Sequence, residues 1–164
     1  MNPVRESNGV SAAGQEKPSI LIIDNSRDFT HAAKVALEKT GRYVVREEND
    51  SSKAHQTALT FKPDLVLLDI AMPETDGGEV AAWIQSDPAL HRIPIVFLTA
   101  LVTMAEARAG LRIQGHPFLA KPIGLPELIK GIEENLPARE FYDVATTTNS
   151  TLEQNGDKYE RTYS

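Results

Sequence analysis

Four short apolar runs in this chain each end in a polar residue that could take part in chemistry. The set comprises a carboxylate, a carboxylate–amide pair, a hydroxyl and an ammonium: Asp69, Asp24–Asn25, Thr99 and Lys121. Carboxylate and amide oxygens are hard ligands suited to Mg²⁺, which can neutralise charge as a phosphoryl group approaches a carboxylate. An ammonium and a hydroxyl can hold the oxygens of that phosphoryl group. These residue types therefore predict phosphoryl transfer onto a carboxylate.

Asp69 is the predicted acceptor of the phosphoryl group. It closes the apolar run Leu65–Leu68 and is followed at once by the turn Met72–Gly78. A run of this length between turn residues predicts a strand that is buried on both faces. In open α/β sheets, ligand sites lie at the carboxyl ends of the strands. An Asp at a strand end can also simply cap a turn, so Asp69 taken alone leaves both interpretations open.

The elements that must position these residues alternate between apolar runs and helical patterns. Strands are expected at residues 19–23, 43–47, 64–68, 93–98 and 116–120. Helices are expected at residues 27–39, 51–61, 78–86, 103–113 and 125–136. This alternation predicts an α/β fold of the flavodoxin-like, doubly wound (βα)5 type, with a five-stranded parallel sheet of strand order 2-1-3-4-5. All four polar strand ends would then point to the same edge of the sheet.

Length and composition are those of one globular domain with polar ends. The 164 residues are 41% hydrophobic and 24% charged and carry a net charge of −6, which argues against nucleic-acid binding driven by overall charge. The chain has no cysteine, so disulfides, thiolate catalysis and zinc–thiolate sites are excluded. No apolar run approaches the about 18 residues of a membrane span, and no secretory signal is visible. We therefore expect a cytoplasmic protein without direct contacts to nucleic acid or membrane.

Composition divides the chain into three regions. Residues 1–17 are small and polar without periodicity, which predicts a disordered N-terminal segment. Residues 18–136 hold the alternating elements and form the expected domain. Residues 137–164 contain a polar low-complexity tract and a charged end, which predicts a disordered C-terminal tail. Nothing after Leu136 is long or apolar enough to fold alone, so no output domain is expected there.

Residues 18–136 resemble a response-regulator receiver domain of the CheY-like superfamily, the kind that sensor histidine kinases phosphorylate. The resemblance is carried by four segments at matching separations: Ile22-Ile23-Asp24-Asn25, Leu67-Leu68-Asp69-Ile70-Ala71-Met72-Pro73 with Asp76-Gly77, Leu98-Thr99-Ala100, and Lys121-Pro122. Since no output domain is expected after Leu136, we expect a stand-alone receiver domain. The resemblance implies that it is not an enzyme and catalyses only its own phosphorylation and dephosphorylation. The implied donor is a histidine kinase or phosphotransfer protein, and the implied output is a downstream protein target in a two-component system or phosphorelay.

The resemblance also implies roles for individual residues. Asp69 matches the phosphoacceptor, and Thr99 and Lys121 match the phosphate contacts that complete the catalytic set. Asp24 matches the first position of an acidic pocket that holds magnesium. Phe118 matches an aromatic switch that swings inward when the Thr moves toward the phosphate, beside the face of the fourth helix, fifth strand and fifth helix that partners read. The Lys121–Pro122 bond is typically cis in this family.

Asn25 departs from the pattern of the family. It stands where a second acid most often binds the metal directly, and an amide oxygen can coordinate but carries no charge. We therefore expect weakened Mg²⁺ binding and slower phosphorylation, although an Asn here can also be tolerated with normal function. The metal positions implied by the match are Asp24, Asn25, Asp69 and Ala71. Ala71 and Leu101 lie at variable positions beside the site, where small or apolar residues predict a long-lived acyl phosphate.

Other classes of protein stay open beside this interpretation. Asn25 favours a pseudo-receiver, an interaction module that keeps the fold but works without phosphorylation. Haloacid-dehalogenase-like phosphatases also use an Asp at a strand end. They resemble one another in having a second Asp two residues later, and this chain has Ala71 at that position. A flavodoxin-like cofactor binder would need a phosphate loop rich in Gly, Ser or Thr after the first strand, and this chain has none.

The remaining polar and aromatic features are interpreted as structural. The histidines are scattered without helical i, i+4 spacing, so surface positions are expected for His31, His55, His91 and His116. Trp83 lies in an apolar helical pattern, which predicts core or half-exposed packing. The acidic segment 47–50 is expected to be a solvated loop.

Overall fold

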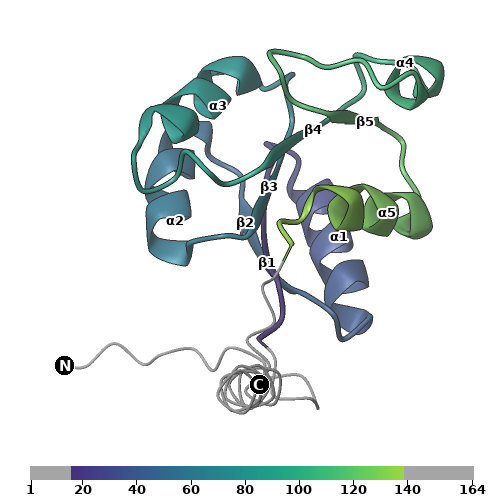
Figure 1. Ribbon diagram of the computed structural model, residues 1–164, viewed down its shortest axis with the longest axis horizontal. Coiled ribbons are helices and arrows are strands. Elements are labelled where there is room, and N and C mark those ends of the chain that lie inside the picture. Colours follow the sequence, from purple (N-terminus) through teal and green to yellow (C-terminus); the bar gives the residue numbers. More distant parts are fainter. Residues whose placement is uncertain (1–15, 139–164) are drawn as a thin grey trace, which may run out of the picture.

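The computed structural model describes residues 16–138, which form a five-stranded parallel sheet between two layers of helices (Figure 1). The sheet has the order β2-β1-β3-β4-β5, as the alternating sequence pattern predicted. The strands are β1 (Ser19–Ile23), β2 (Val44–Glu48), β3 (Leu65–Leu68), β4 (Ile95–Thr99) and β5 (Phe118–Ala120). The helices are α1 (Arg27–Lys39), α2 (Ala54–Phe61), α3 (Gly77–Ser86), α4 (Met104–Arg108) and α5 (Leu125–Asn135), and a 3₁₀ turn, η1 (Ser51–Lys53), precedes α2.

The predicted terminal segments fall almost entirely outside the described residues. The expected disordered segment 1–17 overlaps the structure only at residues 16 and 17, and the expected tail 137–164 only at residues 137 and 138. Among residues 16–138, no helix is both long enough and apolar enough to span a membrane.

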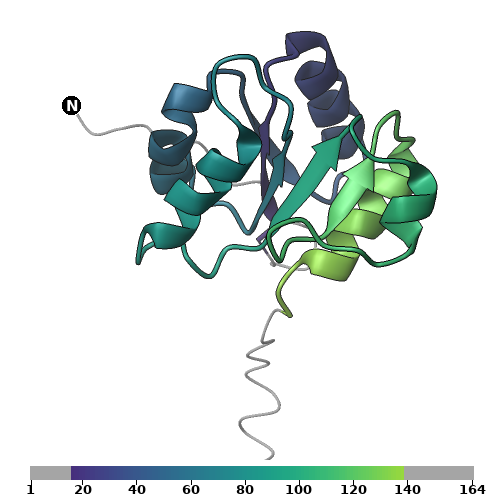
Figure 2. The same cartoon turned by 90° about the horizontal axis from the view of Figure 1, so that it is seen from above.

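Helices cover both faces of the sheet, which explains why every residue of β3 and β4 is buried (Figure 2). Alternate side chains of the central strands point to opposite faces and enter two separate cores. One core packs under α2 and α3 and includes Leu21, Ile23, Val66, Leu68 and Phe97. The other packs under α1 and α5 and includes Ile20, Ile22, Leu65, Leu67 and Val96. The carboxyl ends of the strands are thereby fixed by packing on both sides.

Helix α1 begins and ends where its sequence predicts. The side chain of Ser26 accepts the backbone N–H of Phe29 and caps the first turn. Gly41 follows the last turn with φ +74°, a conformation that glycine adopts without steric cost. The cap fixes the start of the helix close to the end of β1.

The region between β4 and β5 differs from the prediction. A helix was expected over residues 103–113, but α4 ends at Arg108, and Gly110 then takes φ +70°. The chain next forms a tight turn in which Ile113 and His116 exchange backbone hydrogen bonds of 2.9 and 2.8 Å. Because His116 belongs to this turn, β5 begins at Phe118 and not at residue 116 as expected.

The structure also corrects two predictions about polar residues. The segment 47–50 is not a solvated loop, because its first two residues belong to β2 and the amide of Asn49 donates to the carbonyl of Asp24 at 2.8 Å. His116 is only 7% exposed and meets the ring of Phe97 edge-on. His55 is half-buried, with its Nε2 2.8 Å from the carboxylate of Asp87.

Candidate functional site

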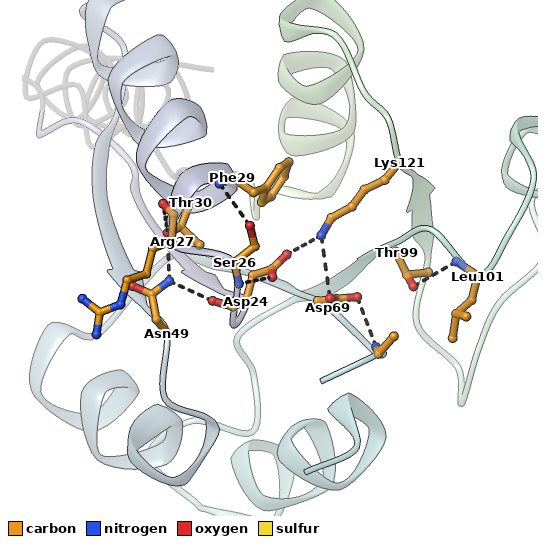
Figure 3. A network of polar contacts seen from close by, with 11 residues as sticks. Asp24, Ser26, Arg27, Phe29, Thr30, Asn49, Asp69, Thr99, Leu101 and Lys121 are labelled. Carbon is orange, nitrogen blue, oxygen red and sulfur yellow. Dashed lines mark hydrogen bonds and ion pairs between the residues drawn. The ribbon is translucent and has the colours of Figure 1, made fainter. Parts of the chain in front are cut away.

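Asp24 and Asp69 lie side by side at the carboxyl end of the sheet, directly after the neighbouring strands β1 and β3 (Figure 3). The strands pair with Ile23 opposite Leu68, so the residues that follow leave the sheet together. The backbone N–H of Asp69 donates to the carbonyl of Ile23 at 3.0 Å, and that of Asp24 donates to the carbonyl of Glu48 at 3.1 Å. Asp24 is 2% exposed and Asp69 is 7% exposed. Two carboxyl groups are therefore held in a largely desolvated position.

Lys121, directly after β5, supplies the positive charge of this site. Its backbone N–H donates to the carbonyl of Thr99 at 2.9 Å, which continues the pairing of β4 and β5. The Lys121–Pro122 peptide bond is cis. The ammonium hydrogen-bonds to the carboxylate of Asp24 and lies 3.7 Å from Oδ2 of Asp69, with 17% of the side chain exposed. One ammonium thus faces both acids.

Two further groups favour the charged form of the Asp69 carboxylate. The backbone N–H of Ala71 donates to its Oδ1 at 3.1 Å. Thr99, the last residue of β4, is fully buried, and its hydroxyl accepts the N–H of Leu101 at 3.2 Å. The same hydroxyl favours the charged form of Asp69 and so acts to lower the pKa of that carboxyl. The structure therefore brings together the four predicted strand-end residues: Asp24, Asp69, Thr99 and Lys121.

Burial sets the electrostatics of Asp69. Loss of solvation raises the pKa of its carboxyl above the ordinary value of 3.8, and the nearby charge of Asp24 adds to this increase. The Lys121 ammonium, the Ala71 N–H and the Thr99 hydroxyl oppose it by stabilising the charged form. The carboxylate is therefore positioned by hydrogen bonds but poorly solvated, which suits a nucleophile better than a group whose only task is to cap a turn.

The other predicted site residues lie at the margin of this cluster. Asn25 is exposed and lines a hollow of about 350 Å³ with residues of η1 and of the loop after β3. Ala71 has no ligand atom in its side chain, so it could offer a metal only its backbone carbonyl. Phe118 is buried in the core beneath α2 and α3 and pairs in register with Phe97. The side chain of Phe118 is therefore buried in this structure, and its role as a switch stays a prediction.

The oxygen atoms of this site suit Mg²⁺, but they carry less negative charge than three carboxylates would. Carboxylates of Asp24 and Asp69 are oxygen ligands of the preferred kind, and Mg²⁺ characteristically keeps several waters beside one or two carboxylates. The amide of Asn25 and the carbonyl of Ala71 are further oxygens in this part of the fold. Within residues 16–138, no group of three or more His, Cys, Asp or Glu residues is placed to hold a metal. A third charge is missing at the position of Asn25.

The residues that hold Asp24 and Lys121 in place were not predicted from the sequence. The backbone N–H of Ser26 donates to Oδ1 of Asp24 at 2.9 Å, and Asn49 donates to the Asp24 carbonyl from the end of β2. The ring of Phe29 lies beneath the ammonium of Lys121, 4.2 Å from Nζ to the ring centroid. The Asp-x-Ser spacing at the start of α1 could have indicated the first contact. The contacts of Asn49 and Phe29 join distant segments, so no local sequence pattern predicts them.

The fold and this cluster define a receiver, a domain with an acidic pocket at the carboxyl edge of a parallel sheet. The chain belongs to the response regulator receiver domain family, which matches residues 20–133. It is 34% identical over 111 residues to the phosphate regulon transcriptional regulatory protein PhoB of Pseudomonas aeruginosa, covering 68% of this chain and 48% of that protein. It is 28% identical to the polar-differentiation response regulator DivK of Brucella anthropi, covering 72% of this chain and 95% of that protein.

Solved structures show the same fold. The chemotaxis protein CheY4 of Vibrio cholerae superimposes with a TM-score of 0.64 at 22% identity, covering 73% of this chain and 99% of that chain. The N-terminal domain of a response regulator receiver protein from Methanoculleus marisnigri superimposes with a TM-score of 0.54 at 31% identity, covering 74% and 98%. The chain spans about half the length of PhoB and of the similar regulator RpaA of Synechocystis. It is thus the receiver domain of a two-component response regulator.

Proposed function

We propose that this domain accepts a phosphoryl group on Asp69 from a phosphohistidine of a sensor histidine kinase or phosphotransfer protein. The observation that carries the proposal is the position of the Asp69 carboxylate, which lies at a strand end between the Lys121 ammonium and the Ala71 N–H. In the transfer, a carboxylate oxygen of Asp69 forms the new O–P bond as the N–P bond of the donor breaks. The donor imidazole keeps the electron pair of that bond, so no oxidant or reductant is required.

The surrounding residues would stabilise the transferred group. The Lys121 ammonium, 3.7 Å from the Asp69 carboxylate, and the Thr99 hydroxyl, which favours the charged form of that carboxyl, would hold phosphoryl oxygens. Asp24 and Asp69, with oxygens of Asn25 and Ala71, would hold Mg²⁺. When bound there, the metal would neutralise negative charge on the carboxylates and the incoming phosphoryl group.

The proposed output is a change of protein contacts around β5. Thr99 would give up its present contact with Leu101 to bind a phosphoryl oxygen. It pairs in register with Ala120 of β5, two residues after Phe118. A hollow of about 450 Å³ adjoins Phe118 and is lined by residues of α4, β5 and α5, including Ala107 and Lys130. We propose this face as the contact surface for a downstream protein. The domain acts on no other substrate and catalyses only its own phosphorylation and dephosphorylation.

The location and partners follow from the same proposal. RpaA is described as DNA-binding, but that protein is about twice as long as the matched segment. The net charge of −6 gives no support for direct contact of this chain with nucleic acid. The cytoplasm is the proposed location, since a chain without cysteine is compatible with a reducing compartment.

A second candidate function is a pseudo-receiver that signals without phosphorylation. Asn25 favours it by removing a metal-binding charge, and Lys121 favours it by already neutralising Asp24. Phosphotransfer separates the two candidates. A panel of phosphorylated histidine proteins is mixed with the chain in Mg²⁺, and transfer is followed by radiolabel, with Asp69→Asn as the variant and the exposed Asp28→Asn as the matched control.

Label on the wild type and on Asp28→Asn, but not on Asp69→Asn, supports the receiver. Absence of label from every donor and from a small phosphodonor supports the pseudo-receiver. The same material yields the lifetime of the acyl phosphate, which we propose to be long because the Ala71 side chain can neither orient nor activate a water molecule. Loss of the label within seconds would contradict that part of the proposal.

A further inference from the structure

The first turn of α1 is tied by hydrogen bonds to Asp24, one of the two acids of the site. Ser26 joins the two, because its backbone N–H donates to Asp24 and its side chain accepts the N–H of Phe29 at 3.3 Å. The amide of Asn49 ties the same turn to β2 through the Asp24 carbonyl and the hydroxyl of the fully buried Thr30. The position of the Phe29 side chain is therefore coupled to the position of Asp24.

The ring of Phe29 forms the apolar side of the pocket that holds Lys121. Phe29 is half-buried, packs against the core beneath α1 and α5, and presents its ring to the ammonium at 4.2 Å from Nζ to the centroid (Figure 3). A cation within about 6 Å of a ring centroid is attracted by the electron density of the ring face. The carboxylates of Asp24 and Asp69 contact the same ammonium. Lys121 thus has two anionic partners and one aromatic partner.

We infer that Phe29 is a positioning residue that holds the Lys121 ammonium in the pocket through the face of its ring, an inference that rests on the proposed phosphorylation of Asp69. The lysine side chain is a flexible four-carbon stem, so its charge must be held in place by contacts near its end. Both anionic contacts change in the proposed reaction, because Asp69 becomes esterified and Asp24 is shared with Mg²⁺. The contact with Phe29 depends on neither change. It keeps the ammonium within reach of the phosphoryl oxygens while its carboxylate partners change.

Two substitutions at Phe29 separate the ring face from simple hydrophobic bulk. Phe29→Leu keeps an apolar side chain but removes the aromatic face, whereas Phe29→Tyr keeps the face. Phe61→Leu is the matched control, because Phe61 is also half-buried and also lies under a cation, Arg46, at 5.9 Å. The readouts are the rate of phosphorylation by acetyl phosphate in Mg²⁺ and the NMR shift of the Lys121 ε-methylene group, which a ring face moves upfield.

We expect Phe29→Leu to slow phosphorylation by about three- to tenfold and to abolish the upfield shift. Phe29→Tyr should keep both close to the wild type, and Phe61→Leu should change neither. An unchanged rate in folded Phe29→Leu would overturn the inference, and so would a loss in Phe29→Tyr as large as that in Phe29→Leu.

The NMR shift separates this inference from the proposed function. If the wild type is not phosphorylated, the proposed function fails, but the upfield position of the Lys121 signal still reports the contact with Phe29. A Lys121 ε-methylene signal at the position of a free lysine in the wild type would overturn the inference without any variant. If Phe29→Leu does not fold, the shift of Lys121 in the wild type still tests the contact with Phe29.

Discussion

The Lys121 ammonium hydrogen-bonds to the carboxylate of Asp24, while its distance to Oδ2 of Asp69 is 3.7 Å. The two acids therefore differ in their environment, although they lie at adjacent strand ends. Asp24 has a direct cationic partner and the N–H of Ser26, whereas burial raises the pKa of Asp69 despite its polar contacts. Asp24 is therefore held by a direct contact with the ammonium and by the N–H of Ser26, whereas Asp69 lies farther from the ammonium and is held by the N–H of Ala71.

Removal of the Asp69 charge should stabilise the fold. A carboxyl group with a folded-state pKa above its unfolded value stabilises the protein below the unfolded pKa, and this stabilisation is lost as pH rises through the folded pKa. At neutral pH the ionised Asp69 therefore destabilises the fold. Asp69→Asn should raise the free energy of unfolding by about 0.5–2 kcal/mol, a gain that is common when a residue of a functional site is replaced. The gain should vanish as pH falls through the folded pKa. Denaturant unfolding at pH 7 and pH 4 measures it, and a destabilised variant at pH 7 would contradict the electrostatic account.

Restoration of a charge at position 25 should strengthen metal binding. Asn25→Asp adds a carboxylate beside Asp24, and an added unit charge near a divalent cation should tighten Mg²⁺ binding by about tenfold or more. Calorimetric titration with MgCl₂ measures the affinity, and phosphorylation by a small phosphodonor should accelerate in parallel. Gln85→Glu, an exposed position on α3, is the control for net charge. Equal Mg²⁺ affinity in the wild type and Asn25→Asp would show that Asn25 does not limit the site.

Two adjacent glycines at the start of α3 should respond differently to the same substitution. A Cβ atom on Gly77 would clash with the backbone carbonyl of Asp69 and would lie 2.7 Å from Cα of Ile70, whereas a Cβ on Gly78 would lie 2.5 Å from the side-chain amide of Gln114. Backbone cannot move away as a flexible side chain can. We expect Gly77→Ala to cost about 1–3 kcal/mol of stability and to slow phosphorylation, because it displaces Asp69.

Gly78→Ala is the matched control for that experiment. Its clash is relieved by rotation of Gln114, and alanine favours a helix over glycine by about 1 kcal/mol, so its stability should change little. Thermal or denaturant unfolding of both variants measures the difference. Equal losses of stability in the two would contradict the close approach of Gly77 to the Asp69 carbonyl.

Much of the site was predictable because the carboxyl ends of parallel strands all lie at the same edge of the sheet. Asp24, Asp69 and Thr99 end strands that are buried on both faces, and Lys121 directly follows the last strand, so their convergence follows from topology alone. The end of α1 was likewise predictable from Gly41. These features depend on local patterns that the tertiary structure does not override.

The rest depended on contacts between distant segments. A helix was expected to reach Ile113, but Gly110 and the turn before His116 use backbone conformations that the sequence pattern does not reveal. His116 resembles a surface residue in the sequence and is buried only because that turn folds against Phe97. Phe29 reads as an ordinary core position of a helix. Its contact with Lys121 arises only when the first and last βα units meet.

The buried His116 should make the stability of the domain sensitive to mild acid. Burial lowers the pKa of its imidazole below the ordinary value of 6.5, although a hydrogen bond to the backbone of Ile95 partly opposes this. A histidine with a lowered folded-state pKa costs stability as pH falls below about 6.5, because the unfolded chain binds the proton first. His116→Phe should reduce this loss, whereas His91→Phe, at an exposed position, should not. Urea unfolding between pH 7.5 and pH 5 measures the slope, and identical slopes in the wild type and His116→Phe would contradict the prediction.

In the proposed function, the carboxylate of Asp69 carries the phosphoryl group. The most direct test is to treat the chain with acetyl phosphate with and without Mg²⁺, reduce it with borohydride and map the peptides by mass spectrometry, because reduction converts an aspartyl phosphate to homoserine. We expect homoserine at position 69 in the sample with Mg²⁺ and none at position 24. An unmodified Asp69, or homoserine at another position, would contradict the proposed function.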